Sequence, residues 1–209
     1  ILPKPLLPMK DSTVIENIFQ RFINYGCKNF YLTVNYKAKL LQTYIEETKP
    51  SKIKLKFIKE KKALGTAGGL YFFRRKFKKD FFLCNCDTLI DADFSHIYDF
   101  HIKNNFDITL IAAMKNVSLP YGVCMLDKNH NLIKVDEKPN KNFMVNTGSY
   151  VLSNKVPNLI KSKSKEIQMD ELINSAKKKK LKIGVYPIEA TQWHDTGNWI
   201  DFQKVFQSN

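Results

Sequence analysis

Cysteine is scarce in this chain, and its spacing excludes the common uses of clustered thiols. Only four cysteines occur, Cys27, Cys84, Cys86 and Cys124, without a Cys-x-x-Cys pair or zinc-ligand spacing. Cys84 and Cys86 lie two residues apart in an apolar segment, so they should point to one face of a strand. We expect reduced, buried thiols in a cytoplasmic protein.

Long apolar runs and leader-peptide patterns are also missing. No stretch reaches the roughly 18 consecutive apolar residues of a membrane-spanning helix, so we expect no membrane partner. Hydrophobic residues make up 44% of the 209 and aromatic residues 12%, which excludes a disordered chain. Because this length suits one domain with a real core, we expect residues 1–209 to form a single domain.

Acidic residues are outnumbered, and the net charge of +14 raises the question of a nucleic-acid partner. Such a partner favours a basic stripe interleaved with aromatic side chains, whereas these lysines are dispersed. The run "KKKK" at 177–180 is typical of the solvated C-terminal end of a helix, where cations suit the dipole. We therefore expect no nucleic-acid binding, and we interpret the charge as help in collecting anionic substrates.

The order of predicted elements in the first half indicates an α/β fold. Strands are predicted at 28–35, 52–58, 80–88 and 106–114, and helices before and between them at 11–26, 36–48, 69–77 and 91–105. This alternation favours a mostly parallel sheet with helices on both faces. The strand at 80–88 is nearly all apolar, so it should be central and buried on both faces.

The helix predicted at 11–26 illustrates the local signals. Asp11 or Ser12 should be the N-cap that accepts hydrogen bonds from the first turn, and Gly26 should end the helix. Apolar residues recur between them at helical spacing and should face the core: Val14, Ile15, Ile18, Phe19 and Phe22.

The second half departs from the alternation of strand and helix. Three strands are predicted without a helix between them, at 121–127, 130–139 and 143–153, so we expect antiparallel additions to the sheet. The predicted elements that follow are a helix at 169–180, a strand at 182–188 and a final helix at 198–206. No linker separates the two halves, which favours one domain.

Polar clusters fall at the ends of predicted strands, where open parallel sheets bind their ligands. One of them is "LGTAGGL" at 64–70, which contains Gly65, Thr66, Ala67 and Gly68. These glycines either make only a tight turn or clear space for a flat or phosphorylated ligand at the backbone. A glycine-lined slot of this kind could hold a base.

Two aspartates are candidate metal ligands. Asp87 follows the most apolar strand, where a carboxylate is costly unless it is paired, exposed in a cleft or bound to metal. Asp195 lies between two tryptophans in "QWHDTGNW". Each also has a purely structural interpretation as a turn or helix-capping residue. Together they would suit Mg²⁺, which takes water and substrate phosphate oxygens as further ligands.

The remaining clusters would suit phosphates and hydroxyls. Lys4 stands between two prolines, which hold the segment extended and aim the lysine. Glu137 and Lys138 end a predicted strand, where they would bind hydroxyl and phosphate groups or else form a surface ion pair. The dipeptide "YG" at 121–122 and "NTG" at 146–148 would frame a polyol.

Seven motifs together resemble those of the sugar-1-phosphate nucleotidyltransferases: "PKPLLP", "LGTAGGL", "NCDTL", "YGV", "EKP", "NTGSYVL" and "WHDTGNW". Among these enzymes, the chain is most similar to bacterial guanylyltransferases that act on mannose, heptose or amino-sugar 1-phosphates. The resemblance implies a Rossmann-like three-layer α/β/α fold with a mixed, mostly parallel central sheet. It also implies an Mg²⁺-dependent reaction in which an NTP, with GTP favoured, and a sugar 1-phosphate give an NDP-sugar and pyrophosphate.

The resemblance also implies a role for each motif residue. The catalytic residues would be Lys4, Asp87 and Lys138, with Asp87 and Asp195 as the Mg²⁺ ligands. The nucleotide-binding residues would be Gly65, Thr66, Ala67, Gly68 and Asn85. The sugar-phosphate-binding residues would be Tyr121, Gly122, Glu137, Lys138, Asn146, Thr147 and Gly148.

One motif of the family is absent. A Gly-Gly-x-Gly-Thr-Arg loop, which cradles the triphosphate after a central first strand, should stand shortly before Pro3. The chain opens on Ile1 rather than Met, so we expect a sequence that lacks its first strand and phosphate loop by truncation. The alternative is a catalytically inactive, nucleotide-sugar-binding regulatory relative. A homo-oligomer is compatible with either.

Overall fold

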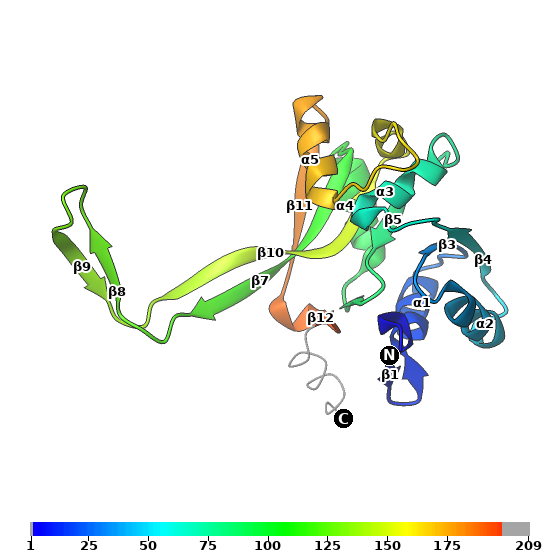
Figure 1. Ribbon diagram of the computed structural model, residues 1–209, viewed down its shortest axis with the longest axis horizontal. Helices are drawn as coiled ribbons and strands as arrows, with labels where there is room; N and C mark the ends of the chain where they lie inside the picture. The colour runs from blue at the N-terminus through cyan, green and yellow to red at the C-terminus, as the bar shows by residue number, and fades with distance from the viewer. Residues whose placement is uncertain (1, 198–209) are drawn as a thin grey trace.

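The computed structural model describes residues 2–197 (Figure 1). Its four-stranded sheet has the strand order β11–β7–β10–β5. The strands are β11 (Ile183–Ile188), β7 (Ile108–Ser118), β10 (Asn140–Leu152) and β5 (Phe81–Cys84). β11 is parallel to β7, whereas β10 is antiparallel to both β7 and β5. Three strands thus share one direction and β10 is reversed, which confirms the expected mixed sheet.

Four strand pairs complete the β-structure of the described residues. β3 pairs in parallel with β4, and the antiparallel pairs are β1 with β2, β6 with β12 and β8 with β9. Their bounds are Pro8–Met9 (β1), Ser12–Thr13 (β2), Asn29–Val34 (β3), Lys54–Lys59 (β4), Thr88–Ile90 (β6), Val123–Leu126 (β8), Leu132–Asp136 (β9) and Trp193–Asp195 (β12). Every predicted strand overlaps an observed one, but the pairing of β6 with β12 was not predicted.

The described residues form the helices α1 (Val14–Asn24), α2 (Ala38–Thr48), α3 (Gly65–Gly68), α4 (Phe94–Lys103) and α5 (Met169–Lys178). Four of these five α-helices match predicted ones, whereas α3 lies in the segment predicted as a glycine turn. The predicted N-cap of the first helix is wrong, because Thr13 forms a capping box with Glu16 there. The helix expected at 69–77 is only a 3₁₀ turn over Gly69–Phe73. The helix predicted at 198–206 lies outside the described residues.

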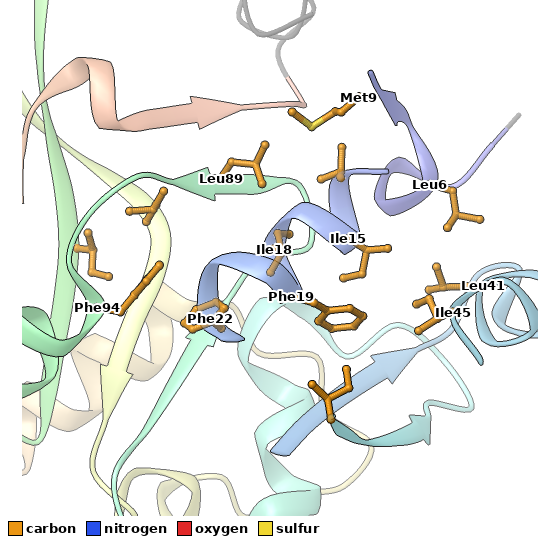
Figure 2. Packing of buried hydrophobic residues seen from close by; sticks show 14 of the residues in the cluster. Leu6, Met9, Ile15, Ile18, Phe19, Phe22, Leu41, Ile45, Leu89 and Phe94 are labelled. Atoms are coloured by element: carbon orange, nitrogen blue, oxygen red, sulfur yellow. The ribbon is translucent and has the colours of Figure 1, made fainter. Parts of the chain in front are cut away.

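Two apolar clusters lie on opposite faces of the four-stranded sheet. The stripe predicted on α1 is buried, and Figure 2 shows Phe19 and Phe22 packed among the side chains of this cluster. Val151 of β10 belongs to this cluster, whereas its neighbours Tyr150 and Leu152 belong to the second cluster, which includes α5. Because neighbouring residues of a strand face opposite ways, helices cover both faces, and the three-layer α/β/α expectation is confirmed.

A cavity of about 960 Å³ separates the parallel pair β3–β4 from the four-stranded sheet. Its lining is rich in aromatic side chains, which include Phe19, Phe22, Phe30 and Phe82. In the described chain β5 pairs only with β10, and all four of its side chains are half-buried. The expectation that this strand is central and buried on both faces is therefore wrong for residues 2–197, because one edge of β5 faces the cavity.

The cysteines are unpaired, but they are less buried than predicted. Cys27 and Cys84 are half-buried, whereas Cys86 and Cys124 are exposed. Cys84, the last residue of β5, and Cys86 both line the cavity, but Cys86 lies beyond the end of the strand. Separately, no helix within residues 2–197 is both long enough and apolar enough to cross a lipid bilayer.

The distal halves of β7 and β10, together with the hairpin β8–β9, form an arm over residues 114–144. The ladder between β7 and β10 is continuous from Ala112 paired with Asn146 to Ser118 paired with Asn140. Figure 1 shows this ribbon leading away from the helices, with β8 and β9 at its far end. Large apolar side chains are exposed along it, including Met114, Phe143 and Leu132.

Candidate active site

Lys4, Asp87 and Asp195 converge on one point of the described structure. Lys4 Nζ lies 2.9 Å from Asp87 Oδ2. A β-carbon added to Gly197 would lie 3.0 Å from Asp195 Oδ1, 3.0 Å from Lys4 Nζ and 3.2 Å from Asp87 Oδ2. Three groups that are far apart in sequence thus surround a space about the size of one atom, which only a glycine at position 197 leaves open.

The pairing of β6 with β12 brings the two aspartates together. Thr88, the residue after Asp87, is the register partner of Asp195. Thr196 is buried and fixes the junction, because its backbone N–H and its hydroxyl both donate to the Asp87 carbonyl oxygen, at 3.0 and 2.8 Å. Lys4 reaches the same point from a 3₁₀ turn over Lys4–Leu6, so the expectation that the two prolines hold this segment extended is wrong.

Asp91 stabilises the pairing of β6 with β12 through contacts with neighbouring segments. The sequence did not predict this role. The Asp91 carboxylate accepts a hydrogen bond from Arg21 Nε at 2.7 Å and lies 3.3 Å from His194 Nε2. These two partners lower the pKa of Asp91 to about 2, with His194 contributing most. The Asp91 backbone N–H donates to the Gln192 carbonyl oxygen, and the Asp91 carbonyl oxygen accepts a hydrogen bond from the Gln192 side-chain amide. Asp91 therefore links α1 and β6 to the segment that carries Asp195.

The donor set at this point fits a hard divalent cation. The described residues contain no group of three or more His, Cys, Asp or Glu side chains that would enclose a metal. Two carboxylates remain, and Mg²⁺ is commonly held by one or two carboxylates plus water and substrate phosphates. The hydrogen bond and the charge of the Asp87 carboxylate raise the pKa of Lys4. Asp87 and Asp195 therefore fit the predicted role of Mg²⁺ ligands.

Asn85 and the segment from Asn146 to Gly148 lie beside Asp87. The Asn85 N–H donates to the Gly148 carbonyl at 3.0 Å, and the Thr88 hydroxyl donates to the Thr147 carbonyl at 3.1 Å. Gly148 has φ +79°, and a β-carbon there would stand 2.5 Å from the Asn85 amide nitrogen. The glycine thus allows Asn85 to pack against β10, next to the carboxylates.

The glycine turn at 64–70 packs against another segment of the same chain, residues 165–168. A β-carbon on Gly65 would lie 2.6 Å from the Ile167 carbonyl oxygen, and one on Gly68 would lie 3.1 Å from that of Lys165. The N–H of Ala67 already donates to Ile167, and the N–H of Thr66 donates to the Gln168 side chain. The segment leading into α5 thus fills the space beside Gly65 and Gly68, and nucleotide binding by residues 65–68 stays a prediction.

The other predicted sugar-phosphate residues lie on the arm. Gly122 and Glu137 are neighbours, since a β-carbon on Gly122 would stand 2.8 Å from Glu137 Oε2. Tyr121 is 74% exposed, and Lys138 is exposed beside the end of β9. Figure 1 shows β8 and β9 far from β12, which carries Asp195. The structure therefore brings Lys4, Asp87, Asp195, Asn85 and residues 146–148 together and separates them from Tyr121, Gly122, Glu137 and Lys138.

Comparison with known proteins relates this geometry to characterised relatives. The chain is 30% identical over 210 residues to mannose-1-phosphate guanyltransferase of Saccharomyces cerevisiae, covering 96% of this chain and 57% of the relative. It is 30% identical over 158 residues to D-glycero-alpha-D-manno-heptose 1-phosphate guanylyltransferase of Campylobacter jejuni, covering 75% of this chain and 69% of the relative. The chain spans about half the length of several curated relatives that it matches.

Solved structures share the fold. HddC from Yersinia pseudotuberculosis, in complex with GMP-PN, superposes with a TM-score of 0.77 at 18% identity. That superposition covers 99% of this chain and 89% of the HddC chain. The family model "Nucleotidyl transferase" matches residues 1–209, the whole of the sequence. The chain therefore belongs to the nucleotidyl transferase family.

Proposed function

We propose that this chain carries the transfer site of an enzyme that joins a nucleotidyl group to a sugar 1-phosphate, releasing pyrophosphate. The observation that carries the proposal is the convergence of Lys4, Asp87 and Asp195 beside Thr147 and Gly148. Two carboxylates next to a lysine suit a site that handles phosphates and a divalent cation. Family membership supports the same reaction class.

The reaction is an in-line displacement at phosphorus. An oxygen of the sugar 1-phosphate attacks the α-phosphorus of the NTP, the bond to the β-phosphate oxygen breaks, and pyrophosphate leaves with the electron pair. No general base is required, because a sugar phosphate is already ionised near pH 7. His194 belongs to the Asp91 contact and is not required as a base.

The main barrier is repulsion between two anionic reactants. Two like unit charges at 4 Å repel by about 4 kcal/mol at an effective dielectric near 20. Lys4, which pairs with Asp87 in this structure, would donate to phosphate oxygens and offset part of this charge, while Asp87 and Asp195 would hold Mg²⁺. When bound there, Mg²⁺ supplies charge neutralisation at the phosphates. The protein therefore acts mainly by positioning and electrostatics.

The substrates are proposed from the relatives. Two relatives at 30% identity are named as guanyl- or guanylyltransferases of mannose and heptose 1-phosphates. GTP and a hexose or heptose 1-phosphate are therefore the favoured pair. Glu137 and Lys138 would bind the sugar phosphate, and Asn85 with Thr66, the exposed residue of the turn at 65–68, would contact the nucleotide. Free thiols and a nucleoside triphosphate substrate favour the cytoplasm.

The cavity between β3 and β5 suits an additional strand from a segment that precedes residue 1. Within residues 2–197 each of these strands has one edge without a strand partner, and apolar side chains line the space. Lys4 is bonded to Asp87, which follows β5, so a segment joined to it would reach the carboxylates. A phosphate-binding loop would then stand beside Lys4, and residues 1–209 would be most of one nucleotidyltransferase domain.

A substrate screen tests the function. The full-length protein is incubated with five NTPs and a panel of sugar 1-phosphates, and pyrophosphate release is measured with and without Mg²⁺. We expect Mg²⁺-dependent release with one pair, GTP being the favoured nucleotide. Tight binding of an NDP-sugar without release under any combination would instead identify the inactive regulatory relative.

A further inference from the structure

Asp195 stands on a strand whose own pairing is too short to fix it. Within residues 2–197, the three-residue strand β12 pairs only with β6, and Asp195 is the register partner of Thr88. An isolated pair of strands is at best marginally stable in water. The position of the Asp195 carboxylate therefore depends on contacts outside the strand pair.

His194, the residue before Asp195, makes such a contact. Because side chains alternate along a strand, those of His194 and Asp195 should point to opposite sides of β12. His194 Nε2 lies 3.3 Å from Asp91 Oδ2, and Asp91 Oδ1 accepts a hydrogen bond from Arg21 Nε at 2.7 Å. Arg21 belongs to α1. One side of β12 is thus tied through Asp91 to a helix of the core, while the other side presents Asp195 to the candidate site.

Backbone hydrogen bonds hold both ends of β12. Before the strand, the Asp91 N–H donates to the Gln192 carbonyl oxygen at 2.9 Å. After it, the N–H and the hydroxyl of Thr196 donate to the Asp87 carbonyl oxygen. These bonds fix the ends of the strand, whereas the contact of His194 with Asp91 limits its rotation about the strand axis.

A small rotation of β12 would be enough to disturb cation binding. Asp195 Oδ1 and Asp87 Oδ2 stand 3.0 and 3.2 Å from the position that a β-carbon on Gly197 would take. The Gly197 N–H also donates to Asp195 Oδ1 at 2.9 Å, so the carboxylate moves with its strand. Mg²⁺ demands oxygen ligands at about 2.0–2.1 Å in near-octahedral geometry and tolerates little displacement of either carboxylate. Trp193 packs against the apolar cluster of α1, so loss of the His194 contact should shift Asp195 rather than release the strand.

We propose that His194 and Asp91 are positioning residues, which hold the Asp195 carboxylate where it can share a divalent cation with Asp87. Neither would contact the substrates, because each acts through β12. Partners that orient the ligands of a metal commonly change its affinity by tenfold or more when they are removed. The inference rests on the proposed function, since it assigns two further residues to the same site.

Direct binding of Mn²⁺ to the full-length protein, measured by electron paramagnetic resonance, tests the inference without turnover. Mn²⁺ serves as the probe because it favours the same oxygen ligands as Mg²⁺. His194→Leu removes the contact with Asp91 and should weaken Mn²⁺ binding by about tenfold. His194→Gln retains an N–H donor close to the position of Nε2 and should bind Mn²⁺ within about twofold of wild type. Asp91→Asn, which loses the charge that faces His194, should also weaken binding and provides the test if His194→Leu does not fold.

Asp93→Ala is the matched control for a general loss of stability. Asp93 lies two residues from Asp91 and caps α4, because its carboxylate accepts the His96 N–H at 3.0 Å. Its removal should lower the melting temperature of the protein but leave the Mn²⁺ affinity within about twofold of wild type.

The Mg²⁺ dependence of pyrophosphate release separates positioning from damage to the whole site. In His194→Leu, the Mg²⁺ concentration for half-maximal release should rise by about tenfold. The rate at saturating Mg²⁺ should stay within about threefold of wild type, because excess cation fills the weakened site. Asp93→Ala should keep the wild-type Mg²⁺ dependence.

Each outcome decides between the inference and its alternatives. Wild-type Mn²⁺ affinity in His194→Leu overturns the inference, as does an equal loss of affinity in Asp93→Ala, which would trace the effect to stability alone. A wild type that does not bind Mn²⁺ overturns it too. If wild type binds Mn²⁺ and His194→Leu binds it more weakly, but no substrate pair gives pyrophosphate, the proposed function fails and the positioning roles stand.

Discussion

The body of the molecule, residues 2–113 and 145–197, differs from the arm in where its apolar side chains lie. In the body, Phe19 is 1% exposed and Leu89 is fully buried, whereas on the arm Leu132 is 60% and Ile133 66% exposed. Hydrophobic burial therefore stabilises the body, and backbone pairing sets the shape of the arm. The body carries the carboxylates and the arm carries the residues expected to bind sugar, so the two regions differ in both stability and role.

The largest expected effect is on enzymatic activity, which should depend on the carboxylates of the body and not on the aspartate of the arm's hairpin turn. Asp87→Ala should reduce Mg²⁺-dependent pyrophosphate release by about a thousandfold, because one of two carboxylates for the cation is lost. Asp127→Ala removes an aspartate from the hairpin turn of the arm and should change the rate by less than about twofold. The rate is measured at saturating substrates. A D87A variant that retains the wild-type rate would remove the metal site from the proposal.

The second expected effect is on the free energy of unfolding, which should be more sensitive to a leucine of the body than to a leucine of the arm. Leu89→Ala should lower the free energy of unfolding by about 3 kcal/mol, because it leaves a cavity in the buried core. Leu132→Ala, the same change on the exposed arm, should cost less than about 0.5 kcal/mol. Urea unfolding at protein concentrations that keep the chain monomeric measures both. Equal losses would mean that the arm packs against the body in solution.

Local patterns predicted most of the body. The α1 stripe, the alternation of strands and helices, and the meeting of Asp87 with Asp195 all follow from periodicity and from the placement of ligands at strand ends. Asp91 was not predictable, because its role depends on the pairing of β6 with β12 across about a hundred residues. Its local sequence shows only an aspartate after a short apolar run.

Contacts between distant parts of the sequence explain why the surroundings of the glycine turn at 64–70 and the length of the arm were not predicted. The glycines at 65 and 68 have the composition of a ligand loop, but the segment at 165–168 occupies their space. The predicted strand at 106–114 ends at the polar residues Lys115 and Asn116, whereas β7 continues to Ser118 because β10 supplies partners. That extension of the strand separates Lys138 from Asp87.

A third prediction concerns Lys138, which is expected to bind the sugar 1-phosphate and not the NTP. Lys138→Ala should raise the KM for the sugar 1-phosphate by about tenfold, which corresponds to roughly 1.4 kcal/mol, because one charge-assisted contact is lost. The KM for the NTP should change by less than about twofold. Lys134→Ala, another exposed arm lysine, is the matched control and should leave both constants unchanged. A larger effect on the NTP would place Lys138 with the nucleotide.

The smallest predicted effect compares a buried histidine of the body with an exposed one of the arm. His101 is fully buried, with Nδ1 2.7 Å from the Thr109 hydroxyl and Nε2 3.4 Å from Asp80. Burial lowers the pKa of His101, while Asp80 and Asp107 oppose that shift. The unfolded chain therefore takes up a proton first as the pH falls below about 6.5, so folding stability should fall with it.

Urea unfolding at pH 7.5 and 5.5 measures this difference in wild type, His101→Gln and His130→Gln. Wild type should lose up to about 1 kcal/mol between the two pH values. H101Q should lose less, because its glutamine does not titrate, whereas H130Q should behave like wild type since His130 is exposed on the arm. If H130Q rather than H101Q removes the acid sensitivity, the arm contributes to folding stability, and the contrast between the two regions is wrong.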